Sequence, residues 1–125
     1  MNLALQDGIF KAQDLMLQMP QVKCEVFHHF SDGLYARELH IPEGVVLVGA
    51  LHKTRHMFFV QKGQCTVITH EGEETITAPY MGETVPGIKR IIRADTDCVW
   101  IGFHVTDKTE PDEIGKDILE DWVCG

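Results

Sequence analysis

The sequence predicts an all-β sandwich or barrel in a single domain, with a short helix before it and another after it. Three observations predict this class. The 125 residues match the length of one domain. Short runs rich in β-branched residues recur along the chain, separated by turns that contain Gly, Pro or Asp. Helical patterns do not alternate with these runs, which argues against a parallel α/β sheet.

The first element is a helix expected over residues 9–18, which ends before Pro20. Apolar residues recur there at a spacing compatible with a helix, in IFKAQDLMLQ. Two strands are expected next, in VKCEVFHHF and LYARELHI. The SDG between them predicts a tight turn, because Gly33 is free to adopt a positive φ. A second turn is expected at PEG, residues 42–44.

The remaining strands are expected up to residue 105. Residues 45–60 read as one extended run, and shorter runs follow it, separated by turns at QKGQ, EGEE, MGE and DTD. A C-terminal helix is expected over about 109–122, with Thr109 as its N-cap and Pro111 in its first turn. Its predicted apolar face consists of Ile114, Ile118, Leu119 and Trp122.

Composition restricts the class of protein. The chain is 44% hydrophobic and 24% charged, and no apolar run approaches the roughly 20 residues that cross a bilayer. The N-terminus lacks the basic segment of a signal peptide, so a cytoplasmic location is expected. Four cysteines without CxxC spacing fit a reducing compartment, and Cys65 and Cys98 are expected to be buried as small hydrophobes.

Charge points to a small anionic partner. The net charge of −8 argues against general nucleic-acid binding, which requires a basic face. Six of the eleven Lys and Arg residues nevertheless lie between residues 53 and 93, whereas seven acids lie within residues 107–121. The locally basic centre favours an anionic ligand there. Four of these six cations are expected to form an exterior basic strip: Lys53, Arg55, Lys89 and Arg93.

Two histidines in the run HKTRH are the first candidate functional residues. If the run is extended, His52, Thr54 and His56 point to the same face. Two imidazoles on the inner face of a small barrel are costly to bury unless they find partners. Metal ligation by neutral imidazole is one solution, and hydrogen bonding in a metal-free pocket is another.

The segment around these histidines resembles the first motif of the cupins, G(X)5HXH(X)3–4E(X)6G. With Gly63 as the closing glycine, Gly44 occupies the opening position and His56 the glutamate position. The two histidine positions hold Ala50 and His52. The resemblance implies a cupin jelly-roll barrel, a double-stranded β-helix, over about residues 21–106 of the single domain 1–125.

The second cupin motif, PXG(X)2H(X)3N, is approximated by VPGIKRIIRA. Here Pro86 and Gly87 form the turn, Arg90 takes the histidine position and Ala94 the asparagine position. The resemblance covers about residues 42–105. The combination HKTRH…PGIKR…VWIGFHVT is also similar to small cupin proteins of tailed phages, whose function is mostly unassigned, which implies a viral origin.

The ligand set departs from the cupin pattern at three positions, but another histidine can complete a metal site. His104 shares a strand face with Trp100 and Gly102 in VWIGFH. His52, His56 and His104 together would suit a divalent Zn, Fe, Mn or Ni ion and leave coordination positions open. A pocket without metal remains the alternative.

Arg90 is the substitution with the clearest chemical meaning. A guanidinium cannot ligate a metal and stays charged, so inside a barrel it requires an anion, either a protein carboxylate or a bidentate carboxylate or phosphate of a ligand. The expected ligand-binding residues are Arg90, His52, His56, Thr54 and Trp100.

Three functions follow from these residues. The first is a small-molecule-binding cupin that holds an anion and, in one form of the hypothesis, a divalent metal. The second is a metal-dependent dioxygenase, isomerase or lyase in which Arg90 fixes a substrate carboxylate. The third is a phage factor that binds or sequesters a host protein or a signalling nucleotide, in the host cytoplasm. In each case a homodimer is expected, because cupin barrels pair through edge strands.

Overall fold

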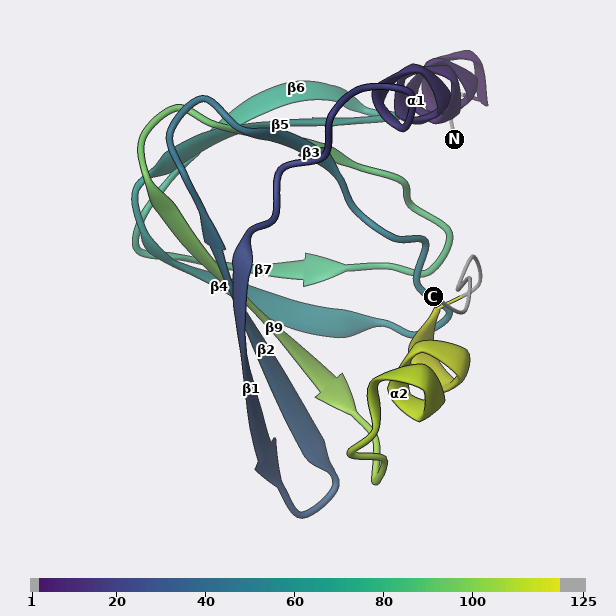
Figure 1. Ribbon diagram of the computed structural model, residues 1–125, viewed down its shortest axis with the longest axis vertical. Coiled ribbons are helices and arrows are strands. Elements are labelled where there is room, and N and C mark those ends of the chain that lie inside the picture. The colour runs from purple at the N-terminus through teal and green to yellow at the C-terminus, as the bar shows by residue number, and fades with distance from the viewer. Residues whose placement is uncertain (1–2, 120–125) are drawn as a thin grey trace.

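The structure, a computed structural model, describes residues 3–119 and contains two antiparallel sheets that face each other, with α1 and α2 near opposite ends of the chain (Figure 1). The elements in chain order are α1 (Leu3–Met16), β1 (Glu25–Ser31), β2 (Leu34–Ile41), β3 (Val46–Val48), β4 (His56–Lys62), β5 (Gln64–Thr69), β6 (Gly72–Thr77), β7 (Tyr80–Thr84), β8 (Ile91–Ala94), β9 (Cys98–Val105) and α2 (Pro111–Ile118).

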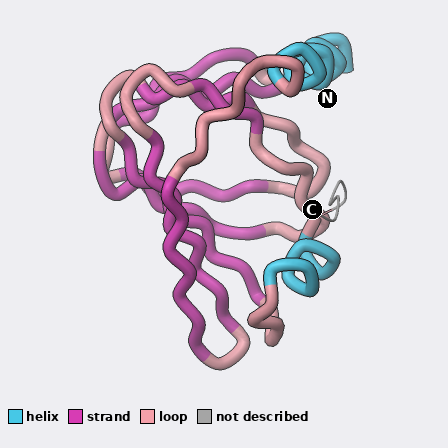
Figure 2. Tube along the Cα trace, viewed as in Figure 1, coloured by secondary structure: helices cyan, strands magenta, loops and turns pink. Residues whose placement is uncertain are grey.

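The sheets have the crossed-over strand order of a jelly roll. One sheet has the order β1-β2-β9-β4-β7 and the other the order β3-β8-β5-β6, and every neighbouring pair is antiparallel. Figure 2 shows the two layers as separate groups of strands connected by loops at their edges. The predicted all-β jelly roll with an N-terminal and a C-terminal helix is therefore confirmed.

The hydrophobic core lies between the inner faces of the two sheets. Alternate residues of each strand point inward, so that both sheets contribute to it. Cys65 and Cys98 are buried in this core as free thiols, as expected from the sequence. Burial raises the pKa of Cys65 to about 12, which makes this thiol unreactive at neutral pH. The core residues are Ile41, Phe58, Val60, Cys65, Val67, Ile76, Ile92, Ala94, Cys98 and Trp100.

Most of the predicted turns are present. Glycines at five of them have positive φ: Gly33, Gly44, Gly63, Gly72 and Gly87. The turn expected at MGE is wrong, since its glycine lies inside β7. A Cβ there would overlap the ring of Phe58, so Gly82 provides the space that this inward ring occupies.

The extended run expected over residues 45–60 is interrupted. β3 ends at Val48, a loop follows, and β4 begins at His56. The loop backbone bonds to segments far away in the sequence instead of to a neighbouring strand. The amide of Gly49 donates to the carbonyl of Arg90 at 2.9 Å, and the amide of Lys53 donates to the carbonyl of Ile118 at 2.7 Å.

The N-terminal helix is longer than predicted. It begins at Leu3 and is anchored by Gln6, whose side-chain amide donates to the carbonyl of Gly87 at 2.8 Å. Lys89, expected in an exterior basic strip, is instead buried, with its ammonium 5.3 Å from the centre of the Phe10 ring. The strip prediction is wrong for this residue because α1 covers it.

The C-terminal helix is confirmed with a different start. Its N-cap is Glu110 rather than Thr109, and Pro111 lies in the first turn as predicted. Ile114 and Ile118 pack against Tyr35 of β2, whereas the predicted Trp122 lies outside the described residues. Within residues 3–119, neither helix combines the length and the apolar character that a membrane crossing requires.

Candidate metal and ligand site

A cavity of about 640 Å³ lies between the sheets, beside α2. Its apolar wall comes from β1, β2, β3, β8 and α2. None of the residues that line it in the described part of the chain is acidic, although the protein carries 19 Asp and Glu residues. Its ionisable lining residues are Cys24, His28, Tyr35, Arg37, His52, His56, Arg90 and His104.

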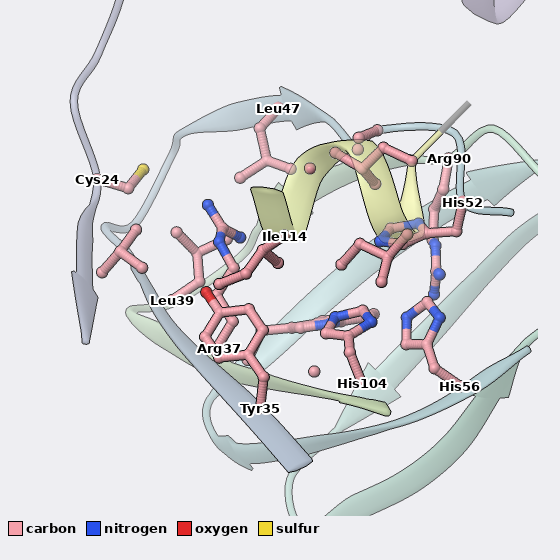
Figure 3. A pocket seen from close by; sticks show the side chains of 18 of the residues that line it. Cys24, Tyr35, Arg37, Leu39, Leu47, His52, His56, Arg90, His104 and Ile114 are labelled. Atoms are coloured by element: carbon pink, nitrogen blue, oxygen red, sulfur yellow. The ribbon is translucent and has the colours of Figure 1, made fainter. Parts of the chain in front are cut away.

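Three histidines converge inside this cavity. One nitrogen from each of His52, His56 and His104 lies within 4.8 Å of the others. Their ring centres are 4.4 Å apart for His52 and His56, 4.3 Å for His56 and His104, and 5.3 Å for His52 and His104. Figure 3 shows the rings pointing toward one another from separate segments. This group could hold a metal ion.

Two of the three histidines are positioned by the five-stranded sheet. His56 is the first residue of β4 and is in register with Thr84 of β7. His104 lies near the end of β9, opposite Tyr35 of β2. Because β4 and β9 are neighbours in the sheet, both rings emerge on its inner face and lie side by side.

The third histidine comes from the loop between β3 and β4. The carbonyl of His52 accepts a hydrogen bond from the amide of Gly87 at 3.2 Å, and the residue forms an isolated β-bridge with Leu119. The next amide, that of Lys53, bonds to Ile118. The loop is therefore held on one side by the turn at Gly87 and on the other by the end of α2.

Burial keeps two of these imidazoles neutral. It lowers the pKa of His104 to about 3, and the charges of His56, His52 and Arg37 act in the same direction. Burial also lowers the pKa of His56, opposed by the Thr54 carbonyl and reinforced by Arg90. Neutral imidazole is the form that ligates metals, so protons do not compete for these two rings near neutral pH.

The hydrogen bonds of the imidazoles are incomplete. His56 Nδ1 faces the carbonyl of Thr54 at 3.4 Å, which leaves Nε2 directed into the cavity. His104 Nδ1 is buried and has no hydrogen-bond partner among residues 3–119. A buried polar atom of this kind is normally satisfied, so the donor set fits an additional bound group.

Arg90 lies immediately beside the histidines (Figure 3). Its guanidinium donates a hydrogen bond to the Thr84 hydroxyl and stacks on two aromatic rings, 5.0 Å from the centre of Phe58 and 5.2 Å from that of Trp100. Burial lowers its pKa to about 10, against the effects of Cys65 and Glu74, so the group stays protonated at neutral pH. Within residues 3–119 no carboxylate pairs with it.

The sequence matches no protein-family model and no curated protein, but solved structures share its fold. A cupin-2 domain containing protein from Shewanella frigidimarina has a TM-score of 0.54 at 14% identity, over 76% of this chain and 92% of that one. Ectoine synthase from P. lautus has a TM-score of 0.63 at 12% identity, over 79% and 75% of the two chains. A cupin-2 domain of an XRE family transcriptional regulator from Enterobacter cloacae has a TM-score of 0.56 at 9% identity, over 68% and 98%.

This chain has the cupin fold. The glycines that the sequence places at cupin motif positions, Gly44, Gly63 and Gly87, all occupy turns with positive φ. The ligand positions of the cupin motifs bring His52, His56 and Arg90 into one cavity. The expected viral origin stays a prediction.

Two other residues of the predicted ligand set lie in different surroundings. Trp100 forms part of the cavity wall and stacks on Phe58, with ring centres 4.3 Å apart. Thr54 is exposed in the loop before β4 and does not line the cavity. Its contact with the site is made by the backbone carbonyl, which faces Nδ1 of His56.

The structure adds cavity residues that the sequence patterns did not single out. Tyr35 is 2% exposed, and its hydroxyl is 2.7 Å from Nδ1 of His28, which lines the same cavity. Burial raises the pKa of Tyr35, against the effect of Arg37. Arg37 also lies on this inner face. The alternation of Tyr35, Arg37 and Leu39 was visible in the sequence, but not which side of the strand faced inward.

Proposed function

We propose that this protein is a small-molecule-binding cupin that holds a divalent transition metal on His52, His56 and His104 and a carboxylate-bearing anion at Arg90. The observation that carries the proposal is the pairing of a three-histidine cluster with a charged guanidinium in a cavity whose described lining has no acid. The cluster offers ligands for a cation, and the guanidinium requires an anion.

The metal assignment is supported by the donor chemistry. Three imidazoles, of which burial keeps His56 and His104 neutral, suit Zn, Fe, Mn or Ni and leave further coordination positions open. Nδ1 of His104 lacks a partner within residues 3–119, which fits a site that is completed by a bound group. When bound, such an ion would act as a Lewis acid that polarises an oxygen of the ligand.

Arg90 supports the anion assignment because it is fixed before the ligand arrives. The Thr84 hydroxyl accepts a hydrogen bond from the guanidinium, and the rings of Phe58 and Trp100 limit the rotation of that group. The remaining N–H groups can bind a carboxylate in a bidentate manner at a small entropic cost. The guanidinium also repels a cation held by the neighbouring histidines, so an anion shared by the two would stabilise both.

This arrangement makes metal and anion binding mutually favourable. We expect a carboxylate such as butyrate to increase the affinity for metal, and the metal to increase the affinity for butyrate by the same factor. In Arg90→Gln the repulsion is absent, so the metal should bind with equal or higher affinity while the effect of butyrate disappears. Equal metal affinities with and without butyrate in the wild type would contradict a shared site.

The decisive experiment is elemental analysis by mass spectrometry of protein purified without a histidine tag. We expect one equivalent of Zn, Fe, Mn or Ni per chain, lost in His52→Ala and in His104→Ala. His40→Ala is a matched control, because His40 lies on the outer face of the same sheet and contacts Glu38 at 2.6 Å. Protein without metal that still binds butyrate through Arg90 would support the metal-free pocket instead.

A metal-dependent enzyme is a second candidate, favoured by the contact between Tyr35 and His28. The phenol and the imidazole form a hydrogen-bonded pair in the cavity wall, and the Tyr35 ring is 5.9 Å from that of His104. Such a pair can deliver or accept a proton beside a metal-bound substrate. We expect Tyr35→Phe to keep metal and anion binding but to lose any dioxygenase, isomerase or lyase turnover found in a carboxylate screen. Undiminished turnover in this variant would exclude the pair from the chemistry.

We further propose that the protein is a cytoplasmic homodimer that uses the outer face of the five-stranded sheet. Large apolar side chains there are 40% to 83% exposed: Phe27, Leu34, Met57, Met81 and Val105. Several exposed apolar side chains on one face of a sheet are a feature of protein interfaces, which supports this proposal. We expect a dimer by light scattering and a monomer in the double variant Met57→Asp, Met81→Asp. A wild-type monomer that forms a stable complex with a host protein would favour the sequestering alternative.

A further inference from the structure

The cavity contains a second guanidinium that the proposed function does not use. Arg37 lies on the inner face of β2 and lines the cavity. Its guanidinium is exposed and makes no hydrogen bond or ion pair with any residue of the part of the chain that the structure describes. Figure 3 shows Arg37 and Arg90 on opposite sides of the cavity, with His104 between them.

The strand register places Gly102 and the His104 ring between the two arginines. Arg37 of β2 is opposite Gly102 of β9, and Gly102 is opposite Phe58 of β4. The guanidinium of Arg90 stacks on the Phe58 ring. Neighbouring strands are about 4.8 Å apart, so the backbones of Arg37 and Phe58 are separated by about 10 Å. Since glycine has no side chain, the imidazole of His104 lies over Gly102, with Nε2 3.1 Å from the position that a Cβ would take.

The two guanidinium charges favour a ligand with more than one acidic group, although Arg37 is exposed and is solvated when no ligand is bound. Arg37 and Arg90 both remain without a carboxylate partner among residues 3–119, and the described lining contributes none. A ligand with a single carboxylate would neutralise one guanidinium and leave the other to water. A ligand with two would satisfy both and relieve their mutual repulsion.

We propose that the cavity binds a dicarboxylate, with one carboxylate at Arg90 and the histidines and the other at Arg37, across Gly102. The inference rests on the proposed function, because the first carboxylate occupies the site assigned there. It adds a ligand class and a second binding residue. The apolar wall near α2, which includes Ile114 and Ile118, suits the hydrocarbon chain between the two acids.

Calorimetry with linear acids tests this inference. The probes are butyrate, with one carboxylate, and succinate, glutarate, adipate and pimelate, with two, each titrated into protein of measured metal content. We expect the best dicarboxylate to bind at least about tenfold more tightly than butyrate, since it gains a charge-assisted contact. In Arg37→Gln this advantage should disappear, with the Kd for butyrate changed less than about twofold.

Arg93→Gln is the matched control. Arg93 lies on the outside of β8, where it pairs with Asp95 at 3.0 Å, and it does not line the cavity. Removal of this charge should leave the preference for dicarboxylates intact. If Arg37→Gln does not fold, Arg37→Lys replaces it, with a smaller loss of the preference because the charge is kept and the bidentate geometry is not.

The outcomes separate this inference from the proposed function. Equal affinities for butyrate and for every dicarboxylate, or a preference that survives in the Arg37 variants, would overturn the dicarboxylate inference alone, provided that Arg90→Gln abolishes butyrate binding. If no acid binds to metal-loaded wild-type protein, both ideas are wrong.

Discussion

Two hollows of this protein meet at Arg90, and their charges are opposite. The cavity beside α2 has no acidic residue in its described lining. A smaller hollow of about 330 Å³ is also lined by Arg90, together with Phe58 and Thr84, which contact the guanidinium. Four glutamates complete its charged lining: Glu71, Glu73, Glu74 and Glu83. The net charge of −8 therefore describes neither hollow. An anion is attracted to one side of Arg90 and repelled from the other.

The largest effect is expected from a substitution that makes the cavity acidic, like the smaller hollow. In Arg90→Glu the cavity becomes acidic, and we expect carboxylate affinity to fall by about 100-fold or more. Arg90→Lys keeps the charge but loses the bidentate geometry and ring stacking, with a loss of about tenfold. Calorimetry with butyrate measures both. An Arg90→Glu protein that binds butyrate as the wild type does would remove Arg90 from the site.

Substitutions at two glycines separate the packing of the Phe58 ring from the binding role of His104. In Gly82→Ala the new methyl overlaps the Phe58 ring, and we expect a loss of about 2 kcal/mol in the free energy of unfolding. In Gly102→Ala the methyl lies 3.1 Å from Nε2 of His104, so the ring must shift. That variant should lose less stability but about tenfold in metal affinity.

Urea unfolding and metal titration of the two variants give the comparison. Wild-type metal affinity in Gly102→Ala would show that the position of His104 is not critical for the site. A Gly82→Ala protein as stable as the wild type would show that the Phe58 ring can move at little cost.

Acid should destabilise the metal-free protein through the cavity. The folded-state pKa of His104 is about 3, below its ordinary value of 6.5, so the unfolded chain binds the additional proton between these values. The stability from neutral His104 is complete above pH 6.5 and falls as pH decreases toward 3, by about 1 kcal/mol per pH unit. Unfolding by urea in EDTA at pH 7, 6 and 5 measures this slope. In His104→Phe it should be smaller; an identical slope would assign the effect to other groups.

The smallest effect is expected in the acidic hollow. The double variant Glu73→Gln, Glu74→Gln reduces the repulsion behind Arg90, and we expect butyrate affinity to increase by about twofold at low ionic strength. At about 0.5 M salt the difference should vanish, because exposed charges are screened. Glu43→Gln, which lines neither hollow, is the control for net charge. A gain that persists at high salt would indicate a structural cause.

Much of the frame could be predicted because turns limit the choice of residue. Gly44, Gly63 and Gly87 take conformations that other residues rarely adopt, and their spacing alone gave the motif positions. Arg90 followed from the same spacing. Strand alternation predicted that His52 and His56 share a face. The two residues do line the same cavity, but His52 lies in a loop, so alternation along a strand does not explain its position.

The remaining residues of the site depend on pairing between distant segments. Arg37 faces inward because β2 pairs with β9, and Gly102 leaves space opposite it only in that register. His28 depends in turn on the pairing of β1 with β2. No local pattern in either strand specifies these partners, because a shift by one residue would reverse the two faces.

The attachment of His52 to the end of α2 has a consequence for the dynamics of the chain. The amide of Lys53 bonds to Ile118, and His52 bridges Leu119, so any local opening of this part of the helix also frees a ligand of the candidate site. The free energy of that opening and the free energy of binding are then linked. A bound ligand should slow hydrogen exchange at the amides of Lys53 and Leu119, and the helix end becomes a reporter of occupancy inside the barrel.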